Sequence, residues 1–389
     1  MRVVFACAGT GGHINPAIAM ANLILKKEED SQVLFIGTKN GLENKLVKNA
    51  GYEIKHIRTG KILRQLTLKN VTALINAYKG IFDAKKILEE FKPDLVIGTG
   101  GYICGPVMKA ATRLKIPYLL HESNAFPGVA VKLLAKNAKC VMLGFEDAKD
   151  RLNSKANAVY TGTPAKFGEE DIFRLDKQQC LEKLGLQNIN KKIVLVTCGS
   201  QGAKRINEVV MSMIKKYQDK NTYYILVTGD KNYDEVLKLK EEAEKEIGHS
   251  LDENLRLEKF IFNMDEMYKV ADLCITRAGA MTISELALAH KPSILIPLPT
   301  AAENHQFFNA KVLEQVNAAK IIEQKDLTEE KLNETVLEIL KDNENINRMG
   351  ENAAKVIVKN VEEKIYECIK KISRWGIWKL VGQVQKLKI

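Results

Sequence analysis

A glycine-rich segment near the start of the 389-residue chain, at residues 8–13, ends in a histidine. Glycines let backbone N–H groups approach a phosphate closely, and the beginning of a helix, here predicted at Pro16, favours negative charge. Histidine has an ordinary pKa near neutrality, so His13 is either a general base or a side chain that braces the turn. Ile14 stands where a dinucleotide-binding fingerprint has its third glycine, so an NAD site is disfavoured.

Two more polar segments follow apolar runs in the first half of the chain, at residues 98–106 and 121–124. The first is a second glycine-rich turn, and the second is the run His-Glu-Ser-Asn. Two glycine-rich turns in one domain indicate either two anionic groups or one diphosphate. Each segment alone is explained as a structural turn, whereas all three at strand ends predict one binding crevice.

The second half of the chain has polar segments of its own, at residues 197–203, 277–285 and 303–306. In the first of them, Ser200 and the backbone around it can hold a nucleotide phosphate. In the second, Thr282 and Glu285 share one helix face, where a carboxylate can accept two hydrogen bonds from a ribose. The alternative for this pair is a capping box. The last segment either binds sugar hydroxyls or is an ordinary loop.

These segments lie at the ends of short apolar runs that alternate with amphipathic helical stretches. The runs are residues 2–8, 32–36, 94–97, 118–120 and 140–143, followed by 192–197, 223–227, 255–260, 273–276 and 293–296. Such alternation predicts parallel sheets covered on both faces, and hence an α/β chain with two Rossmann-like domains facing each other across a cleft. The predicted domains are residues 1–161 and 162–345, with helices at 346–373 that pack back on the first domain and a basic tail at 374–389.

Composition excludes several classes of protein. The hydrophobic fraction of 46% and the charged fraction of 28% are typical of globular chains, and there is no repeat or low-complexity segment. The seven cysteines are scattered and the histidines lack metal-ligand spacing, which predicts reduced thiols and no metal site. No run reaches the ~18 apolar residues of a membrane-spanning helix, so we expect a soluble or peripheral protein. The net charge of +11 reflects either solubility or an anionic partner.

Six motifs, in this order, resemble those of the MurG family, the UDP-N-acetylglucosamine–N-acetylmuramyl-(pentapeptide) pyrophosphoryl-undecaprenol N-acetylglucosamine transferases of peptidoglycan synthesis. They are GTGGHINP, GTGGYICGP, HESN, CGSQGA, RAGAMTISE and ENHQFFNA, and the likeness extends over residues 2–373. The resemblance implies a GT-B fold and a glycosyltransferase that needs no cofactor. The implied reaction is an inverting transfer of N-acetylglucosamine from UDP-GlcNAc to the 4-hydroxyl of the muramyl sugar of lipid I, the undecaprenyl-diphosphate-linked acceptor, which gives lipid II.

The resemblance also implies roles for individual residues. His13 is the implied base, and Glu122 is the second implied catalytic residue. Gly101 and Tyr102 are implied to bind the acceptor. The implied UDP-GlcNAc site consists of Thr10, Gly11, Gly12, Asn124, Lys166, Ser200, Ile261, Ala280, Met281, Thr282, Ile283, Ser284, Glu285 and Gln306. Backbone N–H groups at helix beginnings can stabilise the leaving diphosphate without a metal. Lys166 stands where the family has an arginine, and it keeps the charge without the bidentate geometry.

Three alternatives stay open on this pattern. One is a related glycosyltransferase that acts on diacylglycerol, and another is a UDP-sugar epimerase of similar fold. The third is a membrane-surface binding protein without catalytic activity. Replacement of His13 distinguishes them, because the favoured transferase should lose its transfer activity and still bind UDP.

A lipid acceptor requires contact with a membrane surface. Residues 61–92 contain seven basic and three acidic residues. Within them we expect a helix whose apolar side chains mostly pack on the sheet, namely Val71, Leu74, Ile75, Tyr78, Phe82, Leu88 and Phe91, whereas we expect Leu63, Leu66 and Leu68 to be exposed. The tail has Trp375 and Trp378 among basic residues, a combination that favours a lipid headgroup interface. We therefore expect a peripheral protein on the cytoplasmic face of an anionic membrane, with cell-wall or division proteins as further partners and no nucleic acid.

Overall fold

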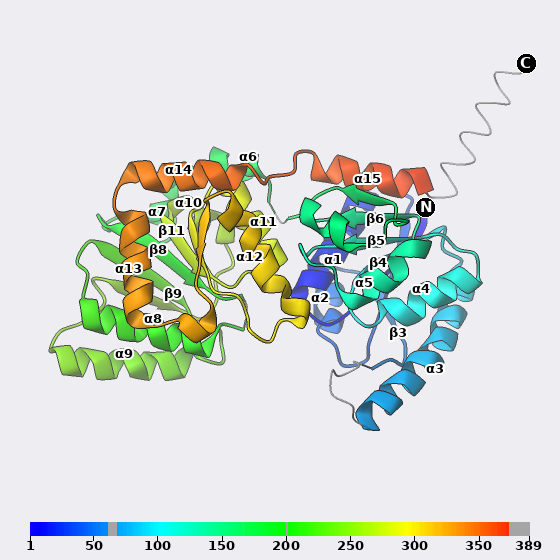
Figure 1. Ribbon diagram of the computed structural model, residues 1–389, viewed down its shortest axis with the longest axis horizontal. Coiled ribbons are helices and arrows are strands. Elements are labelled where there is room, and N and C mark those ends of the chain that lie inside the picture. Colours follow the sequence, from blue (N-terminus) through cyan, green and yellow to red (C-terminus); the bar gives the residue numbers. More distant parts are fainter. Residues whose placement is uncertain (61–67, 166, 200, 373–389) are drawn as a thin grey trace, which may run out of the picture. The chain divides into compact units, whose positions relative to one another are not determined.

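The computed structural model describes residues 1–60, 68–165, 167–199 and 201–372 (Figure 1). The chain divides into two compact units, one made of Met1–Lys166 with Val358–Ile389 and the other of Phe167–Ile357. The boundaries fall later than those expected from the sequence, at 161 and 345. Some predicted features lie outside the described residues: Lys166, Ser200, the tail at 374–389, and the side chains of Leu63, Leu66 and Leu68.

The first unit is built on a seven-stranded sheet with the order β3-β2-β1-β4-β5-β6-β7, in which all neighbours are parallel. The strands are β1 (Arg2–Cys7), β2 (Gln32–Gly37), β3 (Glu53–His56), β4 (Leu95–Gly100), β5 (Tyr118–Glu122), β6 (Cys140–Leu143) and β7 (Ala158–Tyr160). The central strands are buried on both faces, as helix-covered parallel sheets require. The sequence pattern does not predict the edge strands β3 and β7, because only Ile54 of β3 and no residue of β7 is buried.

Helices cover both faces of this sheet (Figure 1). They are α1 (Gly11–Lys27), α2 (Glu43–Asn49), α3 (Leu68–Phe91), α4 (Cys104–Arg113), α5 (Val129–Leu134) and α15 (Val361–Ile372), with 3-10 turns at Ala135–Asn137 and Glu146–Arg151. Alternate residues of a strand point to opposite faces. Val4 accordingly packs in the core beneath α3 and α4, whereas Phe5 packs in the core beneath α1 and α15.

Helix α1 begins at Gly11, so the glycine-rich segment forms its first turn. Pro16 lies inside the helix and has no N–H to donate to the carbonyl four residues earlier. That carbonyl, of Gly12, instead accepts a hydrogen bond from the Ser123 hydroxyl at 3.4 Å. The prediction that the helix begins at Pro16 is wrong because tertiary contacts outweigh the poor helix propensity of glycine.

The second unit is built on a six-stranded parallel sheet with the order β10-β9-β8-β11-β12-β13. The strands are β8 (Lys192–Thr197), β9 (Thr222–Val227), β10 (Leu255–Glu258), β11 (Leu273–Thr276), β12 (Ser293–Leu295) and β13 (Ala319–Ile321). The helices are α6 (Glu169–Arg174), α7 (Lys177–Lys183), α8 (Lys204–Tyr217), α9 (Tyr233–Ile247), α10 (Met264–Val270), α11 (Ala280–Leu288), α12 (His305–Gln315), α13 (Glu329–Leu340) and α14 (Asn343–Ala354), with 3-10 turns at Ala302–Asn304 and Gln324–Asp326. The prediction of two Rossmann-like, parallel-sheet domains is confirmed.

The last helices of the chain divide between the two units. Helix α14 packs on α11 in the second unit, where Gly350 lies against the His290 carbonyl. Helix α15 packs on α1 and β6 of the first unit through buried residues such as Ile365 and Ile369. The segment expected to pack as one piece on the first domain therefore contributes α15 to the first unit and α14 to the second.

The seven cysteines are free thiols with buried side chains. Cys7, Cys104, Cys140 and Cys368 lie in the first unit, and Cys180, Cys198 and Cys274 lie in the second. Desolvation by burial raises the pKa of Cys104 to about 12 and that of Cys198 to about 11. These two thiols therefore stay protonated and unreactive at neutral pH.

Helix α3 exposes an apolar face that the sequence pattern assigns to the core. The exposed fractions are between 50% and 59% for Val71, Leu74, Ile75, Tyr78 and Phe82. The prediction that most of these side chains pack on the sheet is wrong, because the first part of α3 faces the core with small residues, among them Ala73, Gly80 and Ala84. Leu88, near the end of the helix, is buried as expected. Within the part of the chain that the structure describes, no helix combines the length and the apolar character needed to cross a bilayer.

Close backbone approach fixes the turns that follow β8 and β9. A Cβ atom at Gly202 would lie 1.8 Å from the Thr228 carbonyl oxygen, and one at Gly229 would lie 2.5 Å from the Gln201 carbonyl carbon. Both glycines have positive φ, +65° and +80°. The Asn232 amide donates to the Gln201 and Thr228 carbonyls, at 3.0 Å each, and so links the two turns.

Gly202→Ala should destabilise the protein more than Gly185→Ala does. Gly185 has the same φ of +65°, but no atom lies within 4 Å of its Cβ position. Gly185→Ala therefore costs only backbone strain, about 1 kcal/mol, whereas Gly202→Ala adds overlap with a carbonyl and costs about 2–4 kcal/mol in all. Urea unfolding curves of the two variants measure the difference, and equal midpoints would contradict the close approach at Gly202.

Candidate functional site

Three predicted segments of the first unit lie together at one edge of its sheet. Strands β1, β4 and β5 are consecutive neighbours and run parallel, so their carboxyl ends meet at the same edge. The glycine-rich segments follow β1 and β4, and the His-Glu-Ser-Asn run ends β5. The carboxyl edge is where open parallel sheets bind their ligands, so these turns form the candidate site of this unit.

His13 lies in the first turn of α1, against β4. Its Nδ1 atom lies 3.1 Å from the carbonyl oxygen of Ala8. A carbonyl can only accept a hydrogen bond, so this contact requires the proton on Nδ1 and leaves Nε2 as an acceptor. A Cβ atom at Gly100 would lie 2.5 Å from the imidazole Cδ2, and the Thr99 hydroxyl donates to the His13 carbonyl at 2.7 Å. The ring is therefore held in one orientation with Nε2 available to accept a proton.

Gly101 lets the second glycine-rich turn lie against the first. It has a φ of +85°, and a Cβ atom there would lie 2.4 Å from the Ala8 carbonyl oxygen. The neighbouring Tyr102 side chain is half-buried. The acceptor-binding roles of Gly101 and Tyr102 stay predictions, and the structure gives Gly101 a packing role in addition.

The helices next to the predicted site begin without a side-chain cap. No side chain caps α1, α4 or α11 among the residues that the structure describes. The side chains of Asp176, Thr328 and Asp342 cap α7, α13 and α14, whereas other helices, such as α9 and α10, also begin without a side-chain cap. The N–H groups of a first helical turn have no acceptor within the helix. Those near Thr10, Gly11 and Gly12 can therefore bind an anionic oxygen, as expected of a donor site.

Glu122 ends β5 and is only 4% exposed. One carboxylate oxygen accepts hydrogen bonds from the backbone N–H and the side-chain amide of Asn124, each at 2.9 Å. The other accepts from the N–H of Gly128, the residue before α5, at 2.8 Å. The catalytic assignment of Glu122 stays a prediction, and these contacts favour a positioning role toward Asn124.

Sequence reasoning misses several residues that hold these turns. Thr99 and Ser123 donate to carbonyls of the first turn of α1, and Glu43 accepts from the N–H of Gly9. His121 is fully buried, and desolvation lowers its pKa to about 4, so it is neutral at pH 7. Single polar residues at strand ends give no sequence signal that separates such contacts from ordinary turns.

In the second unit, the segment at 277–285 forms the turn after β11 and the start of α11. The N-terminal cap is Gly279, so the alternative of a capping box formed by Thr282 and Glu285 is wrong. Both side chains are half-buried, and the Tyr268 hydroxyl donates to the Glu285 carboxylate at 3.2 Å. Burial keeps the pKa of Tyr268 well above its ordinary value, so this donor stays protonated.

The remaining predicted donor residues of this unit differ in exposure. Met281 and Ser284 are half-buried, whereas Ala280 and Ile283 are buried in the core, so only their backbone can contact a ligand. Gln306 lies in the first turn of α12, and its Oε1 accepts from the Leu298 N–H at 2.9 Å.

Ile261 follows β10 and is half-buried. It lies between the exposed Phe260 and Phe262, whose rings meet edge to face with centroids 4.8 Å apart. The structure places Ile261, Gln306 and the start of α11 after the carboxyl ends of β10, β12 and β11, at one edge of the second sheet. Their role in donor binding stays a prediction.

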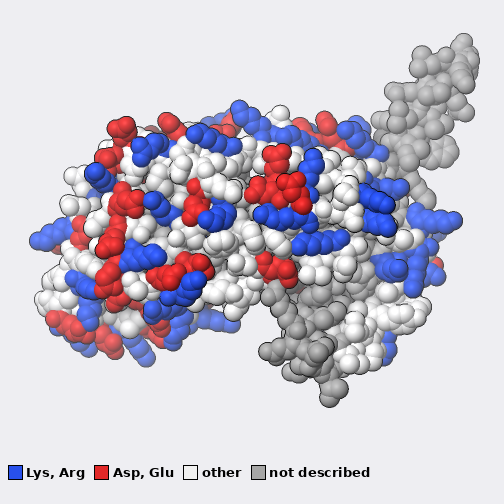
Figure 2. All heavy atoms as spheres, viewed as in Figure 1, with Lys and Arg blue, Asp and Glu red and all other residues white. Residues whose placement is uncertain are grey.

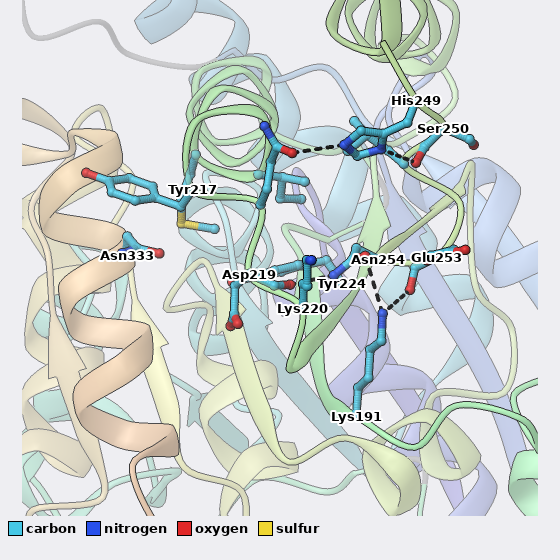
Figure 3. Close-up of a pocket in the computed structure, with 14 residues that line it drawn as sticks. Lys191, Tyr217, Asp219, Lys220, Tyr224, His249, Ser250, Glu253, Asn254 and Asn333 are labelled. Atoms are coloured by element: carbon cyan, nitrogen blue, oxygen red, sulfur yellow. Dashed lines mark hydrogen bonds between the residues drawn. The ribbon is translucent and has the colours of Figure 1, made fainter. Parts of the chain in front are cut away.

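A hollow of about 320 Å³ lies at the opposite edge of the second sheet, where β8 and β10 begin (Figure 3). Lys191, at its rim, donates to the Glu253 carbonyl at 2.7 Å and to the Asn254 side chain at 3.3 Å. These polar groups thus satisfy one another, and no predicted site residue lines the hollow. Because ligands of open parallel sheets bind at the carboxyl edge, this hollow is not the candidate site.

Comparison with known proteins agrees with this architecture. Residues 3–143 match the glycosyltransferase family 28 N-terminal domain, and residues 193–365 match the C-terminal domain of that family. The UDP-N-acetylglucosamine–N-acetylmuramyl-(pentapeptide) pyrophosphoryl-undecaprenol N-acetylglucosamine transferase of Acetivibrio thermocellus is 40% identical over 375 residues, which cover 96% of this chain and 99% of the relative. The protein of the same name from Thermoanaerobacter sp. is 41% identical over 374 residues, 96% of this chain and 100% of the relative.

Solved structures of other proteins share this two-domain fold. MurG of Acinetobacter baumannii superposes with a TM-score of 0.75 at 29% identity and covers 95% of this chain and 99% of its own. MnaA of S. aureus, solved with UDP, has a TM-score of 0.65 at 15% identity over 95% of this chain and 96% of its own, a likeness of fold alone. Because identity near 40% extends over almost the whole length of curated relatives, the chain belongs to the MurG family of glycosyltransferases.

Proposed function

We propose that the protein transfers N-acetylglucosamine from UDP-GlcNAc to the 4-hydroxyl of the N-acetylmuramyl sugar of lipid I, with inversion, and so forms lipid II in peptidoglycan synthesis. The names of its curated relatives support this pair of substrates. The single observation that supports the chemistry is the His13 ring, held through its Nδ1 contact with Ala8 at 3.1 Å so that Nε2 is left as an acceptor.

In this mechanism, Nε2 of His13 accepts the proton of the 4-hydroxyl while its oxygen bonds to the anomeric carbon of N-acetylglucosamine. The bond from that carbon to the diphosphate oxygen breaks on the opposite face, which inverts the anomeric configuration. The leaving diphosphate gains negative charge, which the N–H groups of uncapped helix beginnings stabilise. Thr282 and Glu285 bind the ribose hydroxyls, and Glu122 contributes by holding Asn124.

His13→Ala should lower kcat at least about 100-fold, because the base is lost. Binding of UDP-GlcNAc, measured by calorimetry, should remain, since the other donor contacts are intact. His249→Ala is the matched control: this histidine is exposed and lines the hollow at the other edge of the second sheet, so its loss should leave transfer unchanged. A His13→Ala protein with the full transfer rate would rule out the base assignment.

The substrate pair can be tested by mass spectrometry of the products. The protein is incubated with a lipid I analogue or diacylglycerol and with UDP-GlcNAc, UDP-glucose or UDP-N-acetylgalactosamine. We expect a disaccharide-linked lipid from the lipid I analogue with UDP-GlcNAc, at a rate well above the other combinations. A glycosylated diacylglycerol would instead favour the related transferase, and conversion of UDP-GlcNAc without acceptor would favour an epimerase.

We further propose that α3 binds the cytoplasmic face of an anionic membrane, where the lipid acceptor lies. Its exposed apolar side chains stand beside the exposed Lys79 and Lys86, and Arg113 of α4 lies over the Phe82 ring, 6.0 Å from its centroid. Lys and Arg outnumber Asp and Glu on the visible surface around α4, whereas both signs mix over α13 (Figure 2). Apolar side chains that insert into the membrane surface, together with basic residues that each contribute about 1 kcal/mol of binding, are typical of peripheral membrane proteins.

The basic, tryptophan-containing tail, which lies outside the described residues, belongs to the same proposal. Cell-wall and division proteins at that membrane face are the further partners we expect.

Leu74→Gln combined with Ile75→Gln should weaken vesicle binding at least about tenfold, because two apolar side chains no longer insert. Co-sedimentation with vesicles of phosphatidylglycerol and phosphatidylcholine at physiological salt measures the change. Leu337→Gln is the control, since Leu337 is 48% exposed on α13 of the second unit. Equal binding of the double variant and the control would argue against α3 as the membrane contact.

A further inference from the structure

A buried carboxylate outside the predicted site lies next to the first glycine-rich turn. Glu43, the first residue of α2, has no solvent exposure. Two glycines make room for it: a Cβ atom at Gly37 would lie 2.8 Å from Glu43 Cγ, and one at Gly41 would lie 2.1 Å from Oε1. A carboxylate in the interior is costly unless hydrogen-bond donors surround it, so its partners indicate its role.

The two carboxylate oxygens of Glu43 bond to two different turns. Oε1 accepts from the N–H of Thr38 at 2.9 Å and from its hydroxyl at 2.6 Å, in the turn after β2. Oε2 accepts from the N–H of Gly9 at 3.4 Å, in the turn after β1. Because β1 and β2 are parallel neighbours, Glu43 links the turns at their carboxyl ends.

The N–H of Gly9 and the carbonyl of Ala8 belong to one planar peptide group. This peptide is trans, so its N–H and its carbonyl point in opposite directions. The Ala8 carbonyl is the group that lies 3.1 Å from His13 Nδ1. The Ala8–Gly9 peptide group is therefore bonded to Glu43 through its N–H and to His13 through its carbonyl.

We propose that Glu43 is a positioning residue for His13, which acts through the Ala8–Gly9 peptide group and keeps the His13 proton on Nδ1 and Nε2 free to accept one. The bond from Gly9 is long, at 3.4 Å, but its acceptor is charged, and a charged acceptor polarises the peptide so that its carbonyl accepts more strongly. The catalytic consequence rests on the proposed function, whereas the hydrogen-bonded chain can be measured without turnover.

Glu43→Gln tests this chain because it keeps the shape of the side chain and replaces one acceptor by a donor. An amide nitrogen facing Thr38 would oppose a backbone N–H at 2.9 Å. It therefore turns toward Gly9, whose N–H is farther away, at 3.4 Å. The variant breaks the bond to Gly9 and retains the bonds to Thr38.

Nitrogen-15 NMR of protein labelled at histidine reports the tautomer of each imidazole ring. The signals of His13 are assigned as those that disappear in a His13→Gln protein. We expect protonated Nδ1 in the wild type and a larger Nε2-protonated fraction in Glu43→Gln. In the transfer assay, kcat should fall about tenfold while the KM for UDP-GlcNAc stays within about twofold, as when a residue that orients a catalytic group is lost. A brace that only stabilises the two turns would leave the tautomer unchanged.

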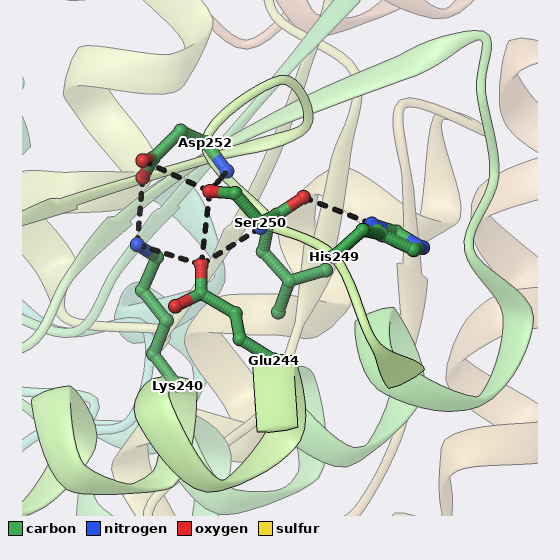
Figure 4. Close-up of polar contacts among 6 residues, drawn as sticks. Lys240, Glu244, His249, Ser250 and Asp252 are labelled. Carbon is green, nitrogen blue, oxygen red and sulfur yellow. Dashed lines mark hydrogen bonds and ion pairs between the residues drawn. The ribbon is translucent and has the colours of Figure 1, made fainter. Parts of the chain in front are cut away.

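Glu244→Gln is the matched control in the second unit (Figure 4). Glu244 also accepts from a backbone N–H, that of Leu251 at 2.8 Å, and from a hydroxyl, that of Ser250 at 3.1 Å. Its replacement should leave both the His13 tautomer and the transfer rate unchanged.

An unchanged His13 tautomer in a folded Glu43→Gln protein would overturn the inference, whatever its activity. A shifted tautomer with an unchanged kcat would support the chain from Glu43 to His13 and overturn the base role of His13 in the proposed function. If Glu43→Gln does not fold, Glu43→Asp keeps the charge but shortens the side chain, which moves the carboxylate away from Gly9, the partner already at 3.4 Å. It should give a smaller shift in the same direction, and the absence of a shift there would also overturn the inference.

Discussion

The contact between the turns after β1 and β4 is the constraint on which the first unit's site depends. At Gly101 the backbone comes so close to the Ala8 carbonyl that no side chain fits, and at Gly100 the same is true of the His13 ring. A larger residue at either place would displace the carbonyl that orients His13, or the ring itself. The turns after β8 and β9 repeat this arrangement with Gly202 and Gly229. Glycine serves here to give space for a neighbour as well as to permit positive φ.

The central strands of both sheets could be predicted from the sequence because buried parallel strands are continuous apolar runs. The edge strands β3, β7 and β13 could not, since each is short and has at most one buried residue. The start of α1 and the exposed face of α3 could not be predicted from the sequence pattern, for the same reason. Both depend on tertiary contacts: Ser123 replaces a missing donor at Pro16, and small residues such as Ala73 and Ala84 let the first part of α3 pack with its large side chains exposed, whereas Leu88 near its end is buried.

The candidate site could be predicted as a set of turns, because glycine-rich and polar segments follow predicted strands. The role of each side chain within a turn could not be predicted. Glu122 and Glu43 are both lone glutamates in polar runs, and both are buried. Glu122 accepts from the N–H groups of Asn124 and Gly128 in the loop after its own strand, whereas Glu43 also accepts from Gly9 in the turn after another strand. The Gly9 partner of Glu43 is set by strand order, since β1 and β2 become neighbours only in the folded sheet.

The distribution of the buried cysteines has a practical consequence. Both units contain native thiols that are almost entirely buried, among them Cys104 in the first unit and Cys274 in the second. A thiol-reactive reagent should therefore label the native protein slowly, at a rate set by local opening rather than by thiol chemistry. Peptide mapping of the labelled positions would then rank the two units by how often each opens, with no introduced probe, and would show whether a nucleotide or a lipid protects one of them selectively.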